Sequence, residues 1–167
     1  MYLIFEGKIT KREKKYFQSF VEWTLKKYGM ADAEISITLA AVPVEEMCGF
    51  SALCTQVEPD EYDIEFKQEF SLLMKMISIS HEMVHVRQYY NKELAHRMRA
   101  GKWTTFWRRK AQPLNEDNYT YWDQPWEIEA HGLEKGQVIQ WAMDTGHIKK
   151  KWMRESIEFL NPDGDLA

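Results

Sequence analysis

The chain has 167 residues, of which 44% are hydrophobic and 14% aromatic, and this composition excludes an intrinsically disordered protein. The net charge of −4 gives no general attraction to nucleic acid or to an anionic membrane surface. A chain of this length predicts a single domain over residues 1–167 with a proper core, and no apolar run reaches the length of a membrane span.

Two features of the sequence indicate a cytoplasmic location. The N-terminal run Met1–Glu6 is too short for a secretory signal. The two cysteines, Cys48 and Cys54, are too few for a disulfide framework, so we expect free thiols in a reducing compartment.

The N-terminal part of the chain combines one predicted helix with several predicted strands. Thr10 and Glu13 have the spacing of a capping box, and the helix that they begin should end near Gly29. A short apolar run and three stretches of mostly alternating pattern predict strands at residues 2–5, 35–39, 49–57 and 62–66.

The strand at 62–66 leads directly into the next helix, so it should lie close to any site on that helix. As an edge strand it would hold an extended peptide by backbone pairing, whereas as an interior strand it would only support the fold. The predicted fold class is α+β, with a small antiparallel or mixed sheet of about three or four strands packed on the helix.

That helix is predicted from about Phe70 to Tyr90 and contains the sequence His-Glu-x-x-His. His81 and His85 are four residues apart, so both imidazoles lie on one face and can bind one metal ion. Glu82 points slightly aside, where it can reach a metal-bound water. The pattern is typical of a zinc hydrolase. The apolar residues expected to bury this helix are Phe70, Leu73, Met74, Met76, Ile77, Met83 and Val84.

The stretch 91–113 carries seven Lys or Arg residues against one acidic residue, Glu93, with Trp103, Phe106 and Trp107 interleaved. Such a stretch can bind single-stranded nucleic acid, or it can form the rim of a lid. Nucleic acid is not the favoured partner, because the chain as a whole is acidic.

A catalytic zinc site needs a third protein ligand besides the two histidines. Gln88 and Asn91 stand where the longer metzincin motif has Gly and His, so that arrangement is excluded. The downstream candidates are His96, Glu127, Glu129, His131 and His147.

The best candidates lie in the stretch Trp122–His131, where a second predicted helix carries Glu127 and Glu129 in its first turn. Asp123 can cap this helix and Pro125 can start it. The helix should run toward Thr145, and its small residues would let it pack closely on the helix of His81 and His85. These small residues are Ala130, Gly132 and Gly136.

The two motifs together resemble those of the glutamate-type zincins, a broad superfamily of zinc metallopeptidases. The matching segments are His81-Glu82-x-x-His85 and Glu127-x-Glu129-Ala130-His131, within roughly residues 62–141. The run from His81 to Gln88 is also similar to small zincin-like proteins, including ones carried by phages. The resemblance implies Glu127 as third ligand and Ala130 as a small contact residue. His131 stands where the family has Asp or Asn, so Glu129 and His131 itself stay open as ligands.

The resemblance implies a minimal zincin-like domain that uses Zn²⁺ to hydrolyse peptide bonds in a peptide or protein substrate. Glu82 would act as general base. The oxyanion would be stabilised by one of four residues, Tyr119, Tyr121, His131 or His147. Two alternatives stay open: hydrolysis of a non-protein amide, and a catalytically idle domain that binds nucleic acid or protein through residues 91–113.

The C-terminal part of the chain predicts a last amphipathic helix from Lys149 to Leu160 and a polar end at 161–165. We assign no function to either.

Overall fold

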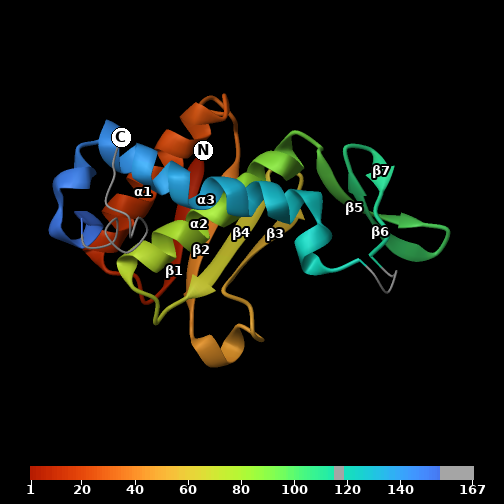
Figure 1. The fold of residues 1–167 in the computed structure, drawn as a ribbon, viewed down its shortest axis with the longest axis horizontal. Coiled ribbons are helices and arrows are strands. Elements are labelled where there is room, and N and C mark those ends of the chain that lie inside the picture. The colour runs from red at the N-terminus through yellow and green to blue at the C-terminus, as the bar shows by residue number, and fades with distance from the viewer. Residues whose placement is uncertain (115–118, 155–167) are drawn as a thin grey trace.

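A computed structural model describes residues 1–114 and 119–154 (Figure 1). Its helices and strands follow in the order β1 (Tyr2–Gly7), α1 (Lys11–Lys27), β2 (Ser36–Val42), η1 (Val44–Glu46), β3 (Ala52–Glu58), β4 (Glu61–Lys67), α2 (Leu72–Tyr90), β5 (Leu94–Arg99), β6 (Lys102–Trp107), β7 (Lys110–Ala111), η2 (Tyr121–Asp123), α3 (Pro125–Asp144) and η3 (His147–Lys149). The fold class is α+β, as predicted.

The main sheet has four strands in the order β1-β2-β4-β3. Strands β1, β2 and β4 run parallel, whereas β3 is antiparallel to β4 and joined to it by a tight turn at Pro59–Asp60. The strand predicted at 62–66 is therefore an interior strand, and the alternative of an edge strand is wrong. The edge beside the functional site belongs to β3.

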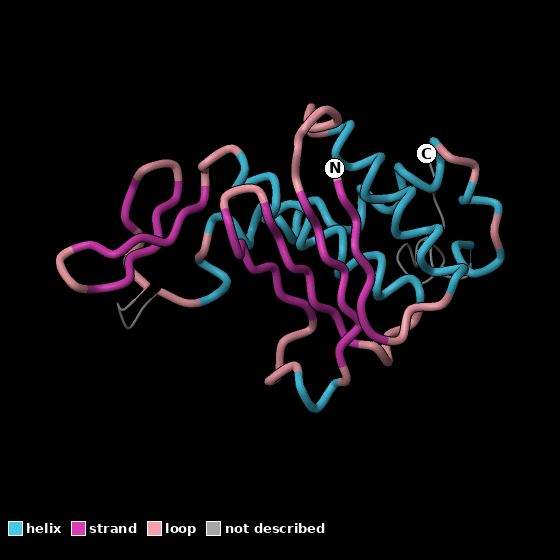
Figure 2. The backbone as a smooth tube through the Cα atoms, turned by 180° about the vertical axis from the view of Figure 1, so that it is seen from behind, coloured by secondary structure: helices cyan, strands magenta, loops and turns pink. Residues whose placement is uncertain are grey.

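The long helices cover one face of this sheet (Figure 2). Strands β2 and β4 alternate between buried and half-exposed residues, so each presents one apolar face to the helices. Ile37, Leu39, Ile64 and Phe66 of that face join residues of α1 and α2 in one hydrophobic core. The same burial fixes the register of the strands, because a slip of one residue would turn the apolar side chains to the other face.

Helix α1 begins with the predicted capping box. The Glu13 backbone N–H donates to Thr10 Oγ1 at 3.2 Å, and the Thr10 N–H donates to Glu13 Oε2 at 2.8 Å. The second oxygen of Glu13 accepts from Lys75 Nζ of α2, also at 2.8 Å. Because Lys75 is buried, this ion pair joins α1 to α2 inside the domain.

Helix α2 is the central helix, and every residue from Lys75 to Val86 is buried. A helix buried on every side has apolar residues on more than one face, and its buried polar residues need partners. Two residues of the predicted buried set depart from it: Met74 is 41% exposed at the rim of the cleft described below, and Phe70 is half-buried ahead of the helix.

Helix α3 packs along α2 and starts at Pro125, as predicted. Asp123 does not cap it, because its carboxylate accepts from the Thr120 N–H and hydroxyl and so closes the short turn η2 instead. Ala130 is buried against α2, but Gly132 and Gly136 are exposed, so the predicted role of these two glycines in helix packing is wrong.

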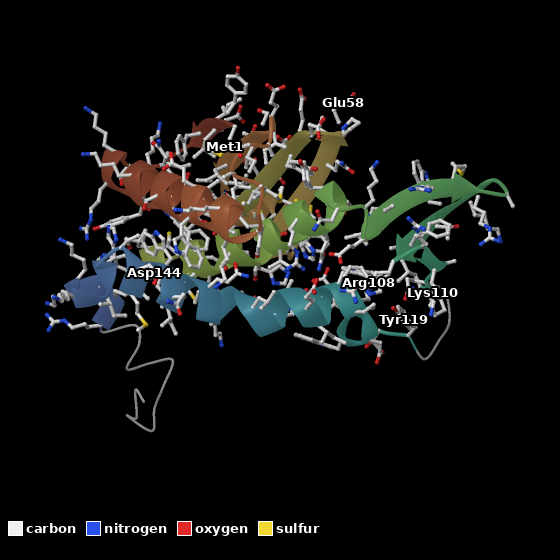
Figure 3. All side chains as sticks on the ribbon, turned by 90° about the horizontal axis from the view of Figure 1, so that it is seen from above. Met1, Glu58, Arg108, Lys110, Tyr119 and Asp144 are labelled. Atoms are coloured by element: carbon white, nitrogen blue, oxygen red, sulfur yellow. The ribbon has the colours of Figure 1, made fainter. Side chains whose placement is uncertain are left out.

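Residues 91–113, for which no strand was predicted, form a second sheet in the order β5-β6-β7. We call the β5–β6 hairpin the ribbon. It extends away from the four-stranded sheet beyond the end of α2 (Figures 1 and 3). Its turn residues Ala100 and Gly101 both have positive φ, as a two-residue hairpin turn of type I′ requires.

Residues 151–154 are helical, and the rest of the predicted C-terminal helix and the polar end lie outside the described residues. Cys48 is exposed and Cys54 buried, and both are free thiols. None of the helices in the described ranges is long and apolar enough to cross a membrane.

Candidate metal centre

His81 and His85 point their imidazoles toward one another from consecutive turns of α2. Their Nε2 atoms lie 3.2 Å apart. In each ring the other nitrogen makes a hydrogen bond of 2.8 Å to an oxygen. His81 Nδ1 is hydrogen-bonded to Glu134 Oε2, and His85 Nδ1 is hydrogen-bonded to Gln88 Oε1. Since these oxygens accept, both Nδ1 atoms carry the proton and both Nε2 atoms face the space between the rings.

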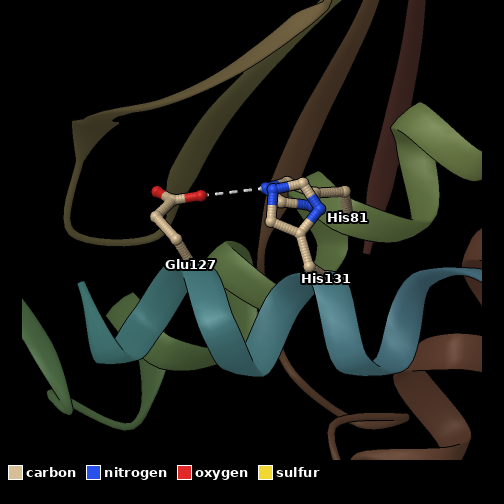
Figure 4. Close-up of side chains that lie close together, drawn as sticks. All are labelled: His81, Glu127 and His131. Atoms are coloured by element: carbon tan, nitrogen blue, oxygen red, sulfur yellow. Dashed lines mark hydrogen bonds and ion pairs between the residues drawn. The ribbon is translucent and has the colours of Figure 1, made fainter. Parts of the chain in front are cut away.

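Glu127 closes this space from α3. Its Oε2 lies 3.2 Å from His81 Nε2, and its Oε1 lies 3.5 Å from His85 Nε2. Figure 4 shows Glu127 and His131 reaching from α3 toward His81 on the opposite helix. The residues of both motifs thus come together, although 42 positions separate His85 from Glu127 in the sequence.

The side chains of His81, His85 and Glu127, called the three donor groups below because each would donate an electron pair to a metal, fit a zinc ion. Zinc–ligand bonds of about 2.0–2.1 Å place neighbouring ligands of a tetrahedral site about 3.3 Å apart, close to the separations of 3.2–3.5 Å seen here. Two imidazole nitrogens and a carboxylate are also the donor types that such a site uses. All three side chains lie in a largely buried place, where a convergence of acceptors without a cation is costly.

Glu134 and Gln88 support the two histidines, and the sequence analysis missed both. Gln88 Nε2 donates to Trp126 O at 3.1 Å and to Glu129 Oε2 at 2.8 Å, which leaves its oxygen to accept from His85. Glu134 could have been found from its spacing, because it lies seven residues after Glu127, on the same helix face. Such partners orient metal-binding histidines and raise their basicity.

Glu82 lies in the wall of the cleft next to these donors and is 5% exposed. Within residues 1–114 and 119–154, no side chain donates a hydrogen bond to its carboxylate. Burial raises the pKa of Glu82 to about 7, although the nearby His85 and His81 act to lower it. A carboxylate with this pKa is suited to accept and return a proton at neutral pH.

Tyr121 and His131 stand beside the three donor groups. The Tyr121 hydroxyl donates to Glu127 Oε2 at 2.6 Å and lies 3.1 Å from His131 Nε2. Burial, followed by the contact with Glu127, raises the pKa of this tyrosine, so it stays a neutral hydrogen-bond donor. The ring of His131 also lies 4.5 Å from that of His81, and with Glu127 these residues form a second group of potential metal ligands.

Four other candidates lie in different surroundings. Glu129 pairs with Arg87 and with Gln88 rather than facing the histidines. Tyr119 donates to Gln112, and His147 stacks on Trp141 at 4.7 Å. His96 lines the cleft but bonds with Tyr89 and Thr105. Geometry therefore favours Glu127 over Glu129 as third ligand, and Tyr121 over Tyr119 beside it.

The donor groups open into a cleft of about 650 Å³. Edge strand β3 forms one wall, η2 and α3 form another, and the base of the ribbon closes one end. The described lining contains no Lys or Arg, and several of its apolar side chains are exposed. These are Phe50, Leu53, Met74, Leu114 and Trp122. An exposed apolar rim around a few polar groups is typical of a binding site.

The protonation of each of the three side chains, His81, His85 and Glu127, depends on the charge of the others. Burial acts to lower the pKa of His81, but hydrogen bonds with Glu127 and Glu134 outweigh burial and raise this pKa. The same balance, with Glu127 as the main partner, raises the pKa of His85. Burial acts to raise the pKa of Glu127, but the two histidines lower it overall. The metal-free centre therefore holds protons where a cation would lie.

No known protein-family model matches the chain, and no curated protein or solved structure matches it.

Proposed function

We propose that the chain is a zinc-dependent metallopeptidase with His81, His85 and Glu127 as metal ligands. The observation that carries this proposal is the convergence of the two Nε2 atoms, 3.2 Å apart, with the Glu127 carboxylate, whose Oε2 lies 3.2 Å from His81 and whose Oε1 lies 3.5 Å from His85, in an apolar cleft. A bound Zn²⁺ would lower the pKa of a coordinated water toward neutrality and polarise a substrate carbonyl. The resemblance to the glutamate-type zincins supports the same ligand set.

The protein's own groups supply the remaining chemistry. Glu82 accepts the proton of the attacking water and passes it to the leaving nitrogen. The Tyr121 hydroxyl, whose single proton is donated to Glu127 in the metal-free centre, would turn to donate it to the oxyanion that develops on the substrate carbonyl, with His131 as its neighbour. Glu134 and Gln88 keep His81 and His85 in the orientation in which both Nε2 atoms would face a bound metal ion.

A peptide is favoured over a small non-protein amide because one wall of the cleft is the edge strand β3. Edge strands expose unpaired backbone N–H and C=O groups, which an extended peptide can pair with. The cleft is open along this strand and large enough for side chains on both sides of a scissile bond.

A catalytically idle domain that binds single-stranded nucleic acid is disfavoured by the ribbon. Cross-strand pairing places exposed Trp103 and its partner Met98 on one face of the ribbon. Arg97, Arg99 and Lys102 lie on the other face. Binding of single-stranded nucleic acid combines base stacking on aromatic rings with phosphate contacts in one groove. A buried carboxylate at Glu82 is also unnecessary for a purely structural zinc site.

Metal analysis combined with casein cleavage tests the proposal. We expect about one zinc per chain, cleavage that a chelator stops, and recovery when zinc is returned. Glu82→Gln should keep its zinc and lose at least about a hundredfold in cleavage rate, since general-base catalysis typically contributes this much. Normal cleavage by Glu82→Gln would refute the role of Glu82, and a zinc-loaded wild type without any hydrolytic activity would refute the function.

A further inference from the structure

The ribbon is attached at its base to α3 and to the turn that follows α2. Arg108 at the end of β6 lies 3.4 Å from Glu93 and 3.7 Å from Glu129 of α3. The ring of Trp107 packs near Trp126, with centroids 6.3 Å apart. These contacts attach the base of the ribbon beside the cleft.

One face of the ribbon continues the surface of the cleft. Residues that pair directly across an antiparallel ladder share a face, and the pairs on this face are Leu94–Trp107, His96–Thr105 and Met98–Trp103. Leu94, His96 and Thr105 line the cleft. Met98 and Trp103 stand one pair further out, about 7 Å along the strands, and are 58% and 73% exposed.

The opposite face of the ribbon is basic. Arg97 and Arg99 of β5 lie on it, with Lys102 directly across from Arg99. Strand β5 is at the edge of its sheet, so a strand added there would direct alternate side chains to the apolar face and to the basic face.

A groove of about 620 Å³ runs beside the free edge of β5. The consecutive residues Leu94 to Arg97 line it, as do residues 56–60 of the β3–β4 turn. Leu94 and His96 border both this groove and the cleft, so the two hollows adjoin at these side chains. Glu58 and Asp60 line this groove together with Lys92 and Arg97. Arg99 follows two residues beyond Arg97, so the outer part of β5 is basic.

We propose that the free edge of β5 binds the part of a polypeptide substrate that extends beyond the cleft, as an added strand with alternating apolar and acidic side chains. Its apolar side chains pack on Met98 and Trp103, and its acidic side chains face Arg97 and Arg99. This inference rests on the proposed peptidase function, because the cleft receives the rest of the same chain. The occupant follows from the charge of the ribbon and from its continuity with the cleft.

The test uses peptides that share one apolar core and differ in an eight-residue extension. The extension alternates Leu with Glu or Leu with Lys, and each version is made at either end of the core. Fluorescence anisotropy with zinc-loaded Glu82→Gln measures binding without turnover. At the end of the core where an extension strengthens binding more, we expect the Leu-Glu peptide to bind about tenfold tighter than the Leu-Lys peptide. The reason is that several cross-strand charge pairs change from attractive to repulsive.

Variants assign this preference to the ribbon. Arg97→Glu/Arg99→Glu should reverse it, and Trp103→Ala should reduce the gain from either extension. Lys11→Glu/Lys15→Glu changes the net charge equally on exposed residues of α1, at the other end of the molecule, and should keep the preference. A single-stranded oligonucleotide serves as competitor.

The outcomes separate the two proposals. Equal affinity for both extensions, or a preference that survives Arg97→Glu/Arg99→Glu, overturns the β5 site even if the wild type cleaves the core. Tighter binding of the oligonucleotide, lost in the same variant, also overturns it in favour of nucleic acid. Ribbon-dependent binding of peptides that the zinc-loaded wild type never cleaves would support the β5 site and refute the peptidase.

Discussion

The Nε2 atoms of His81 and His85 lie 3.2 Å apart although each ring already has a hydrogen-bond acceptor on its other nitrogen. Without a metal, protonation at Nε2 relieves the repulsion between the two nitrogen lone pairs, and the carboxylate of Glu127 accepts a hydrogen bond from the protonated ring. The arrangement explains why the pKa values of both histidines are raised. It also connects metal binding to protonation.

Zinc binding should therefore release protons. A metal ligand must be deprotonated at the binding nitrogen, so zinc at pH 7 should displace on the order of one proton from the histidine pair. Isothermal titration calorimetry in buffers of different ionisation enthalpy measures this number. An observed enthalpy that is the same in every buffer would contradict the prediction.

The same histidines make the stability of the metal-free protein depend on pH. Because the folded-state pKa of His81 is raised above its ordinary value of 6.5, its stabilising contribution is complete below pH 6.5 and is lost as the pH rises through the folded-state pKa. Thermal unfolding of chelator-treated protein should thus show a decline on the alkaline side. Addition of zinc should remove it, and a decline unchanged by zinc would assign the effect to other groups.

Glu127→Ala and Glu129→Ala form a matched pair of variants two residues apart. Loss of the ligand Glu127 should lower zinc affinity by at least about a hundredfold, whereas Glu129→Ala should cost about tenfold or less, through Gln88 alone. Competition with a chromophoric chelator measures both. Retention of zinc by Glu127→Ala with loss in Glu129→Ala would reverse the assignment.

Glu134→Gln tests the support of His81. Replacing the carboxylate by an amide keeps the size but removes the charge that holds the Nδ1 proton, so zinc affinity should fall about 10- to 100-fold. The exposed neighbour Lys135→Gln serves as control and should leave affinity unchanged. Because Lys135→Gln changes the net charge in the opposite direction, a gain in zinc affinity in this variant as large as the loss in Glu134→Gln would show that general charge, not the contact with His81, is responsible.

The ion pair of Glu13 with Lys75 predicts acid sensitivity away from the metal centre. Burial acts to raise the pKa of Glu13, but Lys75 and Thr10 outweigh it and lower this pKa below the ordinary 4.5. The pair's contribution is therefore present above pH 4.5 and is lost as the pH falls through the folded-state pKa.

Glu13→Gln should lower the free energy of unfolding at pH 7 by about 2 kcal/mol, because it leaves Lys75 buried without a carboxylate. The difference in the free energy of unfolding between this variant and the wild type should become smaller at acidic pH. Urea unfolding at several pH values measures both, with the exposed Glu6→Gln as control. A difference that stays constant down to acidic pH would exclude the charge on Glu13 as its cause.

The sequence by itself determined the features that depend on neighbours within one helix or strand. The spacing of His81 and His85 places both rings on one helix face whatever surrounds them, and the capping box of Thr10 with Glu13 needs only its own turn. Alternation of side chains likewise predicted β2 and β4.

Only the tertiary structure decided which acidic residue faces those rings. Glu127 and Glu129 are two positions apart on a helix, so they point in nearly opposite directions, and their spacing cannot say which side meets α2. The buried residues of α3, among them Trp126, Ala130 and Val138, set the rotation of the helix and leave Glu127 and Glu134 facing α2. Similarly, the burial pattern of 62–66 could not show that β3 pairs outside β4, because strand order depends on long-range pairing. Local periodicity fixes which residues share a face, whereas packing between elements decides what that face meets.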